Sequence, residues 1–396
     1  MKILMVNYEY PPLGGGGGIA MMEVAEELAR RHSVHVLTSG AAGLDAVSKH
    51  PSLDLTIHRA AIAGRKDRAT ASFLSMLAFL PSGIRTGNKL LKSAQFDLIN
   101  TWFAIPSGVT GGWIAKKSGV PHVLTVIGGD IYDPSKWYSP HRFPISGRAV
   151  QWAVDRADTY VAISTDIADR SRKHFRFDGN IEVIPLGIRR PEFAPATRQE
   201  LGMDPGRKYI VSVGRLVRRK DYPTLIRALK ALGNSDTDLV MLGDGPEQAN
   251  LKALTHELGI ADRVHFRGFV SNELKYQVLS MSDIFVLASL HEGFGVVYLE
   301  AMFCGLPIIA ANQGGQVDIL KRNVTGDLIN IGSVEEMTAA MRRLLDESDL
   351  RRRIGSDNKA RAEQYTIAQV TARYENVFNK LLAKDLAGLG HSTVSR

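Results

Sequence analysis

Short apolar runs alternate with longer stretches of helical periodicity through the first half of the chain. The runs are rich in aliphatic residues and lie at 2–7, 34–38, 53–58, 97–100, 122–126, 159–163 and 181–185. Near-continuous apolar runs separated by helical segments are typical of parallel strands that are buried on both faces. The pattern therefore predicts an α/β fold with a parallel sheet covered by helices.

The same alternation starts again after a polar segment, Arg189 to Arg207, that contains three prolines and four arginines. Such a segment is typical of a linker rather than of a helix or strand. Beyond it, strands are predicted at 209–215, 239–245, 263–270, 283–289 and 307–310, and a helix at 222–232. We therefore place a domain boundary near Gly187, between an N-terminal domain, 1–187, and a C-terminal domain, 188–365.

One stretch, His291 to Pro307, combines a predicted strand end, a glycine turn and a helix. The turn contains Gly293 and Gly295, and Gly305 and Pro307 end the helix. The unpaired amide groups and the dipole at a helix N-terminus favour an anion. Two acids, Glu292 and Glu300, flank the turn and would repel a bare phosphate. The stretch thus indicates a ligand that presents both phosphate and hydroxyl groups, such as a nucleotide sugar.

A run of five glycines, Gly14 to Gly18, precedes a helix predicted from Ile19 to Arg31. Its spacing loosely fits a dinucleotide-binding fingerprint, but any glycine run satisfies that spacing. Six residues separate the run from the first strand, and the second strand ends in Thr38-Ser39-Gly40 without an acid, which disfavours a dinucleotide site. Glycines here would instead let the backbone approach a ligand closely.

Composition limits the compartment and the partners. The chain has 396 residues, 44% of them hydrophobic, a length that suits two domains. Its single cysteine, Cys304, excludes an intrachain disulfide and fits a reducing compartment. The charge of +8 favours anionic ligands or an anionic membrane surface, whereas no nucleic-acid-binding motif is present. Without a signal peptide or a run of about 18 apolar residues, we expect a cytoplasmic protein, soluble or peripheral to the membrane.

A basic segment, residues 65–92, surrounds the apolar run Phe73 to Leu80, which we expect Pro81 to break. Such a pattern fits a helix lying on an anionic lipid surface, and equally a core helix with solvated ends. Membrane contact is therefore one of two open interpretations. The segment has a single acid, Asp67, against six basic residues: Arg65, Lys66, Arg68, Arg85, Lys89 and Lys92.

The two acids of the stretch 291–307, seven residues apart with Gly293-Phe294-Gly295 between them, resemble the signature of retaining glycosyltransferases of family 4, the glycogen-synthase-like group. The resemblance implies a GT-B fold, two Rossmann-like domains facing each other across a cleft, with a last helix at 366–385 packing back on the first domain. It also implies a nucleotide-diphosphate sugar as co-substrate, a glycan or lipid-linked acceptor, and no metal or other cofactor. No Asp-x-Asp metal signature stands out, since Asp236-Thr237-Asp238 falls on a predicted polar loop.

The resemblance also implies roles for particular residues. The Gly-Arg-Leu segment followed by a lysine implies that Arg215 and Lys220 neutralise the diphosphate, although Arg218 and Arg219 stand beside them. Glu292 would contact the transferred sugar. The other implied donor contacts are Gly16 and Gly17, the base-facing turn Gly268, Phe269 and Val270, the turn Gly293, Phe294 and Gly295, and Glu300 on the ribose.

One departure from the family pattern lies at the end of the strand 122–126. The family's His-Gly-x-Asp type of segment matches here, but Ile127 occupies the usual histidine position. Isoleucine cannot donate a side-chain hydrogen bond, whereas Asp130 remains able to bind a sugar or acceptor hydroxyl. Two alternatives therefore stay open: a nucleotide-sugar epimerase or phosphorylase on the same fold, and a binding protein without catalysis.

Overall fold

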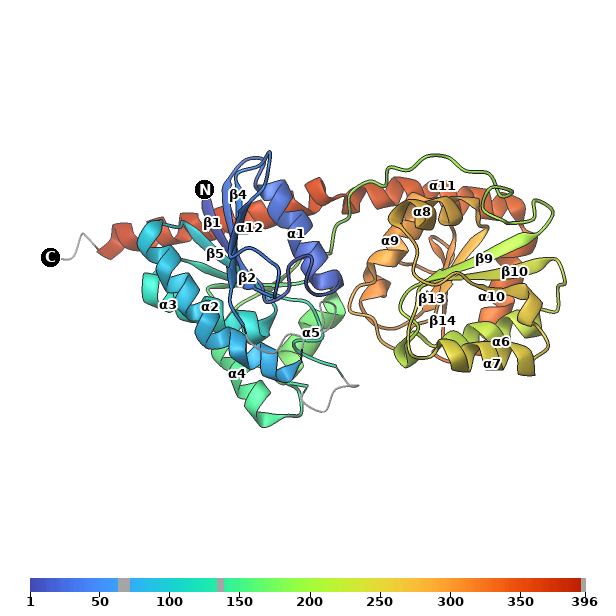
Figure 1. Ribbon diagram of the computed structural model, residues 1–396, viewed down its shortest axis with the longest axis horizontal. Helices are drawn as coiled ribbons and strands as arrows, with labels where there is room; N and C mark the ends of the chain where they lie inside the picture. The colour runs from blue at the N-terminus through green and yellow to red at the C-terminus, as the bar shows by residue number, and fades with distance from the viewer. Residues whose placement is uncertain (63–71, 134–138, 393–396) are drawn as a thin grey trace. The chain divides into compact units, whose positions relative to one another are not determined.

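The computed structural model describes residues 1–62, 72–133 and 139–392. The chain divides into two compact units. The N-terminal unit comprises residues 1–187 and 367–396, and the C-terminal unit comprises residues 188–366. The division falls after Gly187, and the last helix belongs to the N-terminal unit (Figure 1).

The N-terminal unit is built on an eight-stranded sheet with the order β3-β4-β2-β1-β5-β6-β7-β8. All neighbouring strands are parallel except β3, which runs antiparallel to β4 at the edge. The strands are β1 (Lys2–Val6), β2 (Ser33–Ser39), β3 (Val47–Lys49), β4 (Leu55–Ala60), β5 (Leu98–Trp102), β6 (His122–Val126), β7 (Thr159–Ala162) and β8 (Ile181–Val183).

Helices cover both faces of this sheet. On one face, α2 and α3 pack over alternate residues of β1, β2 and β5, with Phe79 and Ile114 in the buried cluster. On the other face, Tyr374 of α12 stacks on Trp102 of β5, and α12 also packs on α1. The helices are α1 (Gly16–Leu28), α2 (Phe73–Ser93), α3 (Val109–Ser118), α4 (Pro144–Val154), α5 (Thr165–His174) and α12 (Ile367–Ser392).

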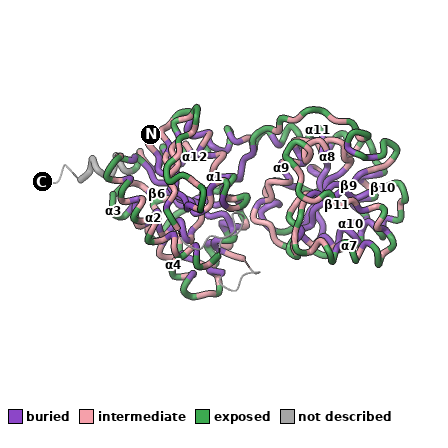
Figure 2. Tube along the Cα trace, viewed as in Figure 1, coloured by how far each residue is buried: buried purple, intermediate pink, exposed green. Residues whose placement is uncertain are grey.

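The C-terminal unit has a six-stranded, all-parallel sheet with the order β11-β10-β9-β12-β13-β14. Its strands are almost wholly buried (Figure 2). The strands are β9 (Lys208–Val213), β10 (Thr237–Leu242), β11 (Val264–Phe266), β12 (Ile284–Leu287), β13 (Ile308–Ala311) and β14 (Gly326–Ile329), and the helices are α6 (Tyr222–Leu232), α7 (Gln248–Glu257), α8 (Asn272–Met281), α9 (Val296–Phe303), α10 (Val334–Asp346) and α11 (Ser348–Ala362).

Both sheets have the doubly wound order in which the chain starts centrally and then reverses direction. The reversal lies between β1 and β5 in the N-terminal unit, and between β9 and β12 in the C-terminal unit. Ligands of open α/β sheets bind outside the carboxyl ends of the strands at this switch point. The predicted pair of Rossmann-like α/β domains is thus confirmed, and each has one edge at which a site is expected.

Several predicted elements differ in extent from the observed ones. The first helix begins at Gly16, not Ile19, so Gly16 and Gly17 lie in its first turn. Pro81 interrupts the apolar run but does not end the helix, because α2 continues to Ser93 with Pro81 on its exposed side and Phe79 and Leu90 buried. The last helix reaches Ser392, beyond the predicted end.

The prediction of a polar loop at Asp236 to Asp238 is wrong, because Thr237 and Asp238 belong to β10. The buried carboxylate of Asp238 is stabilised by Arg207, which donates hydrogen bonds to both of its oxygens at 2.6 and 2.9 Å. His265 Nε2 lies 3.0 Å from the same carboxylate. The strand predicted at 263–270 shrinks to Val264–Phe266, and the rest forms a turn. The part of the predicted basic segment that contains Arg65, Lys66, Asp67 and Arg68 lies outside the described residues.

A pair of stacked histidines links β2 and β4 and predicts a pH dependence of stability. His35 Nδ1 and His58 Nε2 are 3.0 Å apart. Burial and the charge of His35 lower the pKa of His58 from 6.5 to about 4. The folded protein therefore binds fewer protons than the unfolded chain between these two values, and stability falls as the pH drops through this window.

Acidification from pH 6.5 to about 4 should lower the free energy of unfolding by roughly 1–2 kcal/mol through this pair, after discounting for the partial exposure of the ring. Thermal unfolding followed at several pH values measures this effect. His58→Gln should remove this part of the pH dependence, whereas His50→Gln, outside the stacked pair, should keep it. Identical pH profiles for the wild type and His58→Gln would contradict the prediction.

Candidate active site

Two loops at the switch point of the C-terminal unit bring an acid and a lysine together. The first follows β9 through Gly214 and ends in a 3-10 turn, Arg218–Lys220, before α6. The second follows β12 and turns at Gly295, whose φ of 85° requires a residue without a Cβ. Lys220 from the first loop forms an ion pair with Glu292 from the second. The switch point thus unites two residues that are 72 positions apart in sequence.

The Lys220–Glu292 pair is largely shielded from solvent, with side-chain exposures of 8% and 13%. Arg219 adds a second cation, 3.6 Å from the Glu292 carboxylate. Burial acts to raise the pKa of Glu292, but the charges of Lys220 and Arg219 and the hydrogen bond from Lys220 outweigh it, so the pKa lies below its ordinary value. Glu292 is therefore a carboxylate at neutral pH, able to accept hydrogen bonds from hydroxyl groups.

Backbone hydrogen bonds hold the loops of the site in register. Leu290 N donates to Arg219 O at 2.8 Å, and Gly315 N donates to Glu292 O at 2.9 Å. Gly314, with φ of 89°, leaves room for this contact, since a Cβ there would lie 2.6 Å from Glu292 O. The segment after β13, which contains Asp318, thus supports the backbone of Glu292.

The four cations after β9 have different surroundings. Arg218 lies 3.3 Å from Glu247, Arg219 donates to His291 O, and Lys220 binds Glu292. The side chain of Arg215 is exposed and has no hydrogen bond or ion pair within the described part of the chain, although its carbonyl oxygen accepts a hydrogen bond from Val217 N at 2.9 Å. Lys220 is therefore buried and already paired with Glu292, whereas the exposed side chain of Arg215 is free to bind an anionic ligand.

Glu300 forms a second acid–lysine pair on α9. Lys275 Nζ from α8 lies 2.6 Å from Glu300 Oε1, and the hydroxyl of Tyr276 lies 3.4 Å from the same oxygen. Sequence reasoning missed Lys275 and Tyr276. No local motif marks them, because their partner is more than 20 positions away on another helix.

The glycine turn and the base-facing turn present mainly backbone. Phe294 is buried, with its ring tilted against Tyr365, so its side chain belongs to the core of the unit. Gly268 accepts a hydrogen bond from Gly243 N at 2.7 Å, and Phe269 beside it is 91% exposed. Val270 is half-buried. The base-facing turn, Gly268 to Val270, lies just after β11. The glycine turn, Gly293 to Gly295, comes directly after Glu292.

In the N-terminal unit, the predicted residues lie after β1 and β6. Gly16 faces open space, whereas a Cβ on Gly17 would lie 2.6 Å from the Phe103 ring and 3.1 Å from Ile127 Cδ1. The Ile127 side chain and the Phe103 ring thus both lie beside Gly17. An apolar contact occupies the position where the family pattern has an imidazole.

Asp130 is buried and used by the backbone around it. Its Oδ1 accepts hydrogen bonds from Ile127 N at 3.1 Å and Gly128 N at 2.8 Å, and its Oδ2 accepts one from Ala104 N at 2.6 Å. Burial raises the pKa of Asp130, although these backbone donors oppose the rise. The carboxylate therefore fixes the loop after β6 to the loop after β5.

The different surroundings of Gly16 and Gly17 predict opposite effects on stability when each is replaced by alanine. Gly17→Ala should lower the free energy of unfolding by about 1–2 kcal/mol, because its methyl group meets Phe103 and Ile127. Gly16→Ala, the matched control in the same helical turn, should be neutral or stabilising by up to about 1 kcal/mol. Urea denaturation of both variants compares them. Equal stabilities would contradict the packing described for Gly17.

Among the described residues, no group of three or more His, Cys, Asp or Glu side chains could hold a metal ion. Over the same residues, none of the helices combines the length and the apolar character needed to cross a bilayer.

The two doubly wound units define an α/β protein of the GT-B class. Residues 14–190 match the family described as Glycosyltransferase Family 4, and residues 193–361 match that described as Glycosyl transferases group 1. The chain belongs to this group 1, family 4 class and is a glycosyltransferase. The alternative of an epimerase, a phosphorylase or a non-catalytic binding protein is not favoured.

The chain is similar to glycosyltransferases over much or nearly all of its length. The N-acetyl-alpha-D-glucosaminyl L-malate synthase of Bacillus anthracis is 25% identical over 98% of this chain and 100% of its own length. The lipopolysaccharide core biosynthesis glycosyltransferase LpsD of Rhizobium meliloti is 34% identical over 57% of this chain and 65% of its own. Anabaena HepE, solved with UDP and glucose, superimposes with a TM-score of 0.75 at 21% identity, covering 96% of this chain and 100% of HepE.

Proposed function

We propose that this glycosyltransferase transfers a sugar from a nucleotide-diphosphate sugar to a glycan or lipid-linked acceptor, with retention of the anomeric configuration. The observation that carries the proposal is the ionised Glu292, held by Lys220 and Arg219 at the switch point of the C-terminal unit. The UDP and glucose bound to HepE support a nucleotide-sugar donor. LpsD supports an acceptor from cell-surface polysaccharide or glycolipid synthesis.

In the proposed donor complex, Arg215 and Lys220 neutralise the diphosphate, together with the amides of Gly293 to Gly295 at the start of α9. Lys220 already touches Glu292 in the structure. Its ammonium group has three donors, so it can bind phosphate and carboxylate together. Glu292 then accepts hydrogen bonds from hydroxyls of the transferred sugar, and Glu300 accepts them from the ribose. The turn Gly268 to Val270 faces the base.

In the proposed reaction, the bond between the anomeric carbon and the phosphate oxygen breaks, and the nucleoside diphosphate leaves with the electron pair. The acceptor hydroxyl attacks from the same face, and its proton passes to the leaving phosphate. This front-face route preserves the configuration without an enzyme nucleophile. The charge of the leaving group is stabilised by Arg215 and Lys220, so the proposal needs neither a metal ion nor another cofactor.

Three measurements test these points. Thermal unfolding with a panel of nucleotide sugars should identify the donor, since a ligand that binds only the folded state raises the unfolding temperature. Nuclear magnetic resonance of the product should show the anomeric configuration of the donor. Turnover should persist in EDTA. An inverted product, or loss of turnover that Mg²⁺ restores, would overturn the corresponding part of the proposal.

We also propose that the enzyme works in the cytoplasm, at the inner face of the plasma membrane, in peripheral contact with anionic lipid. The lipopolysaccharide pathway of LpsD and the basic, partly apolar α2 support this location. Fractionation of cells should find the protein in the membrane pellet and release it with high salt. Recovery entirely in the soluble fraction at low salt would contradict the proposed location.

A further inference from the structure

Helix α2 has two opposite faces, and only one of them is explained by the fold. Its buried residues recur every three or four positions and pack toward the sheet and α3. They are Ser75, Phe79, Gly83, Gly87 and Leu90. The outward stripe follows the same spacing but changes character along the helix. It begins with Leu74 and Leu77, which are 75% and 46% exposed, and ends with Arg85, Lys89 and Lys92.

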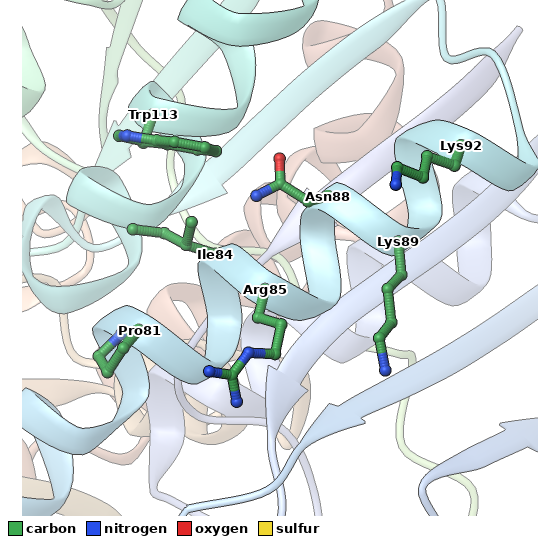
Figure 3. Close-up of a pocket in the computed structure, with 7 residues that line it drawn as sticks. All are labelled: Pro81, Ile84, Arg85, Asn88, Lys89, Lys92 and Trp113. Atoms are coloured by element: carbon green, nitrogen blue, oxygen red, sulfur yellow. The ribbon is translucent and has the colours of Figure 1, made fainter.

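A groove of about 430 Å³ lies between this stripe and α3. Pro81, Ile84, Arg85, Asn88, Lys89 and Lys92 of α2 line it together with Trp113 of α3. Figure 3 shows Ile84 and Asn88 extending from α2 toward the Trp113 ring. Lys117 Nζ lies 5.2 Å from the centre of that ring on α3, and Lys116 precedes it. The groove thus combines an apolar floor with a cationic rim.

Among the described residues, no acid forms an ion pair with the cations that line the groove. Neither α2 nor α3 contains an acid, and Arg85, Lys89 and Lys92 have no ion pair within the described residues. Other helical cations of this unit do pair, as Arg170 does with Asp166 and Arg172 does with Asp169. The Oδ1 atom of Asn88 is buried and has no hydrogen-bond partner. The groove therefore has unused cations and an unused polar side chain.

We propose that the α2–α3 groove binds the phosphate of an anionic phospholipid headgroup, with the outward stripe of α2 lying on the membrane. Lys89, Lys92 and Arg85 would bind the phosphate oxygens, and the amide nitrogen of Asn88 would donate a hydrogen bond to the phosphate. Trp113 suits the boundary between headgroups and acyl chains. This assignment rests on the proposed peripheral contact and is distinct from the donor site in the C-terminal unit.

The exposed leucines favour a lipid surface over other anionic partners. A soluble phosphate or a nucleic acid would use the cations but would leave Leu74 and Leu77 in water. On a membrane, the same helix buries those leucines among the acyl chains while its cationic end remains at the phosphates. The order along α2, apolar first and cationic later, fits a helix that enters the surface at its N-terminal end.

The test is sedimentation of the full chain with vesicles of phosphatidylcholine, with and without phosphatidylglycerol. The wild type should pellet only with the anionic vesicles. The variant Arg85→Gln/Lys89→Gln/Lys92→Gln should bind them roughly 100-fold more weakly, since each basic residue near the surface adds about tenfold or less. Asn88→Leu, which changes no charge, should bind several-fold more weakly if the groove holds a headgroup. Leu74→Ser/Leu77→Ser should also weaken binding.

The matched control is Arg353→Gln/Arg361→Gln/Lys380→Gln, which removes the same charge from exposed positions of α11 and α12. It should pellet like the wild type. Equal loss in both triple variants, or unaltered binding by Asn88→Leu, would reduce the interaction to non-specific charge and overturn the assignment. Inhibition of pelleting by millimolar inorganic phosphate at matched ionic strength, without any effect of the leucine variant, would assign the groove to free phosphate instead.

The vesicle experiment tests the groove independently of the proposed binding of a nucleotide sugar. Nucleotide-sugar binding, measured by thermal unfolding without lipid, involves none of the residues that line the groove and should be unchanged in the groove variants. Loss of vesicle binding with intact donor binding is the expected pattern. A wild type that binds donor but ignores anionic vesicles would overturn the groove and leave sugar transfer standing.

Discussion

Lys220→Met and Glu292→Gln should each lower kcat for sugar transfer by about 10²–10³-fold while the protein remains folded. The lysine is the enclosed cation proposed to stabilise the leaving diphosphate, and the carboxylate is proposed to hold the sugar. In Lys220→Met the Glu292 carboxylate keeps Arg219, 3.6 Å away, as a cationic partner. In Glu292→Gln the Lys220 ammonium loses its ionic partner, but the amide oxygen that replaces the carboxylate can still accept its hydrogen bond. Stability should therefore fall by no more than about 1–3 kcal/mol. Release of nucleoside diphosphate in the presence of acceptor measures the rate.

The matched control for this experiment is Arg218→Gln. Arg218 lies in the same 3-10 turn as Lys220, but its side chain is 90% exposed and pairs with Glu247. It should keep a rate within a few-fold of the wild type. Near-native rates for both Lys220→Met and Glu292→Gln with the true donor would show that the site lies elsewhere.

The sequence predicted the two α/β domains because their strands are buried on both faces and thus read as continuous apolar runs. It also predicted Glu292, Glu300 and the glycine turn, since these residues are close together in the chain. It could not choose among the cations after β9 from charge alone. That choice depends on which cation meets Glu292 in the loop after β12. The loops after β9 and β12 are neighbours only because the two strands pair in the sheet, which local sequence does not show.

Contacts between residues far apart in sequence explain the features that could not be predicted from the sequence. Pro81 interrupts the apolar run of α2 and has a low helix propensity, but the buried side chains on both sides of it stabilise one continuous helix. Asp238 was expected in a loop because it is charged, but Arg207 and His265 satisfy it within a strand. Lys275 was missed because its partner, Glu300, is on another helix. In each case a tertiary partner outweighed the local preference.

Asp130→Ala should lower the free energy of unfolding of the N-terminal unit by about 3 kcal/mol or more, because three buried backbone N–H groups would lose their acceptor. Asp130→Asn should also destabilise the unit. The amide NH₂ group of asparagine would face at least one backbone N–H group, and two hydrogen-bond donors cannot pair with each other. Urea denaturation measures both variants. Urea denaturation of Asp158→Asn, another acid of the same unit that accepts a single backbone hydrogen bond, serves as the control.

This experiment also separates two roles for the same carboxylate. If Asp130 acts mainly by fixing the loops after β5 and β6, activity and stability should fall together in both variants, and cooling or a stabilising osmolyte should restore part of the turnover. If Asp130 instead binds the reacting sugar or acceptor, Asp130→Asn should unfold like the wild type and yet fail to transfer. The three short backbone contacts favour the first outcome, so an Asp130→Asn variant of native stability without turnover would contradict the structural role.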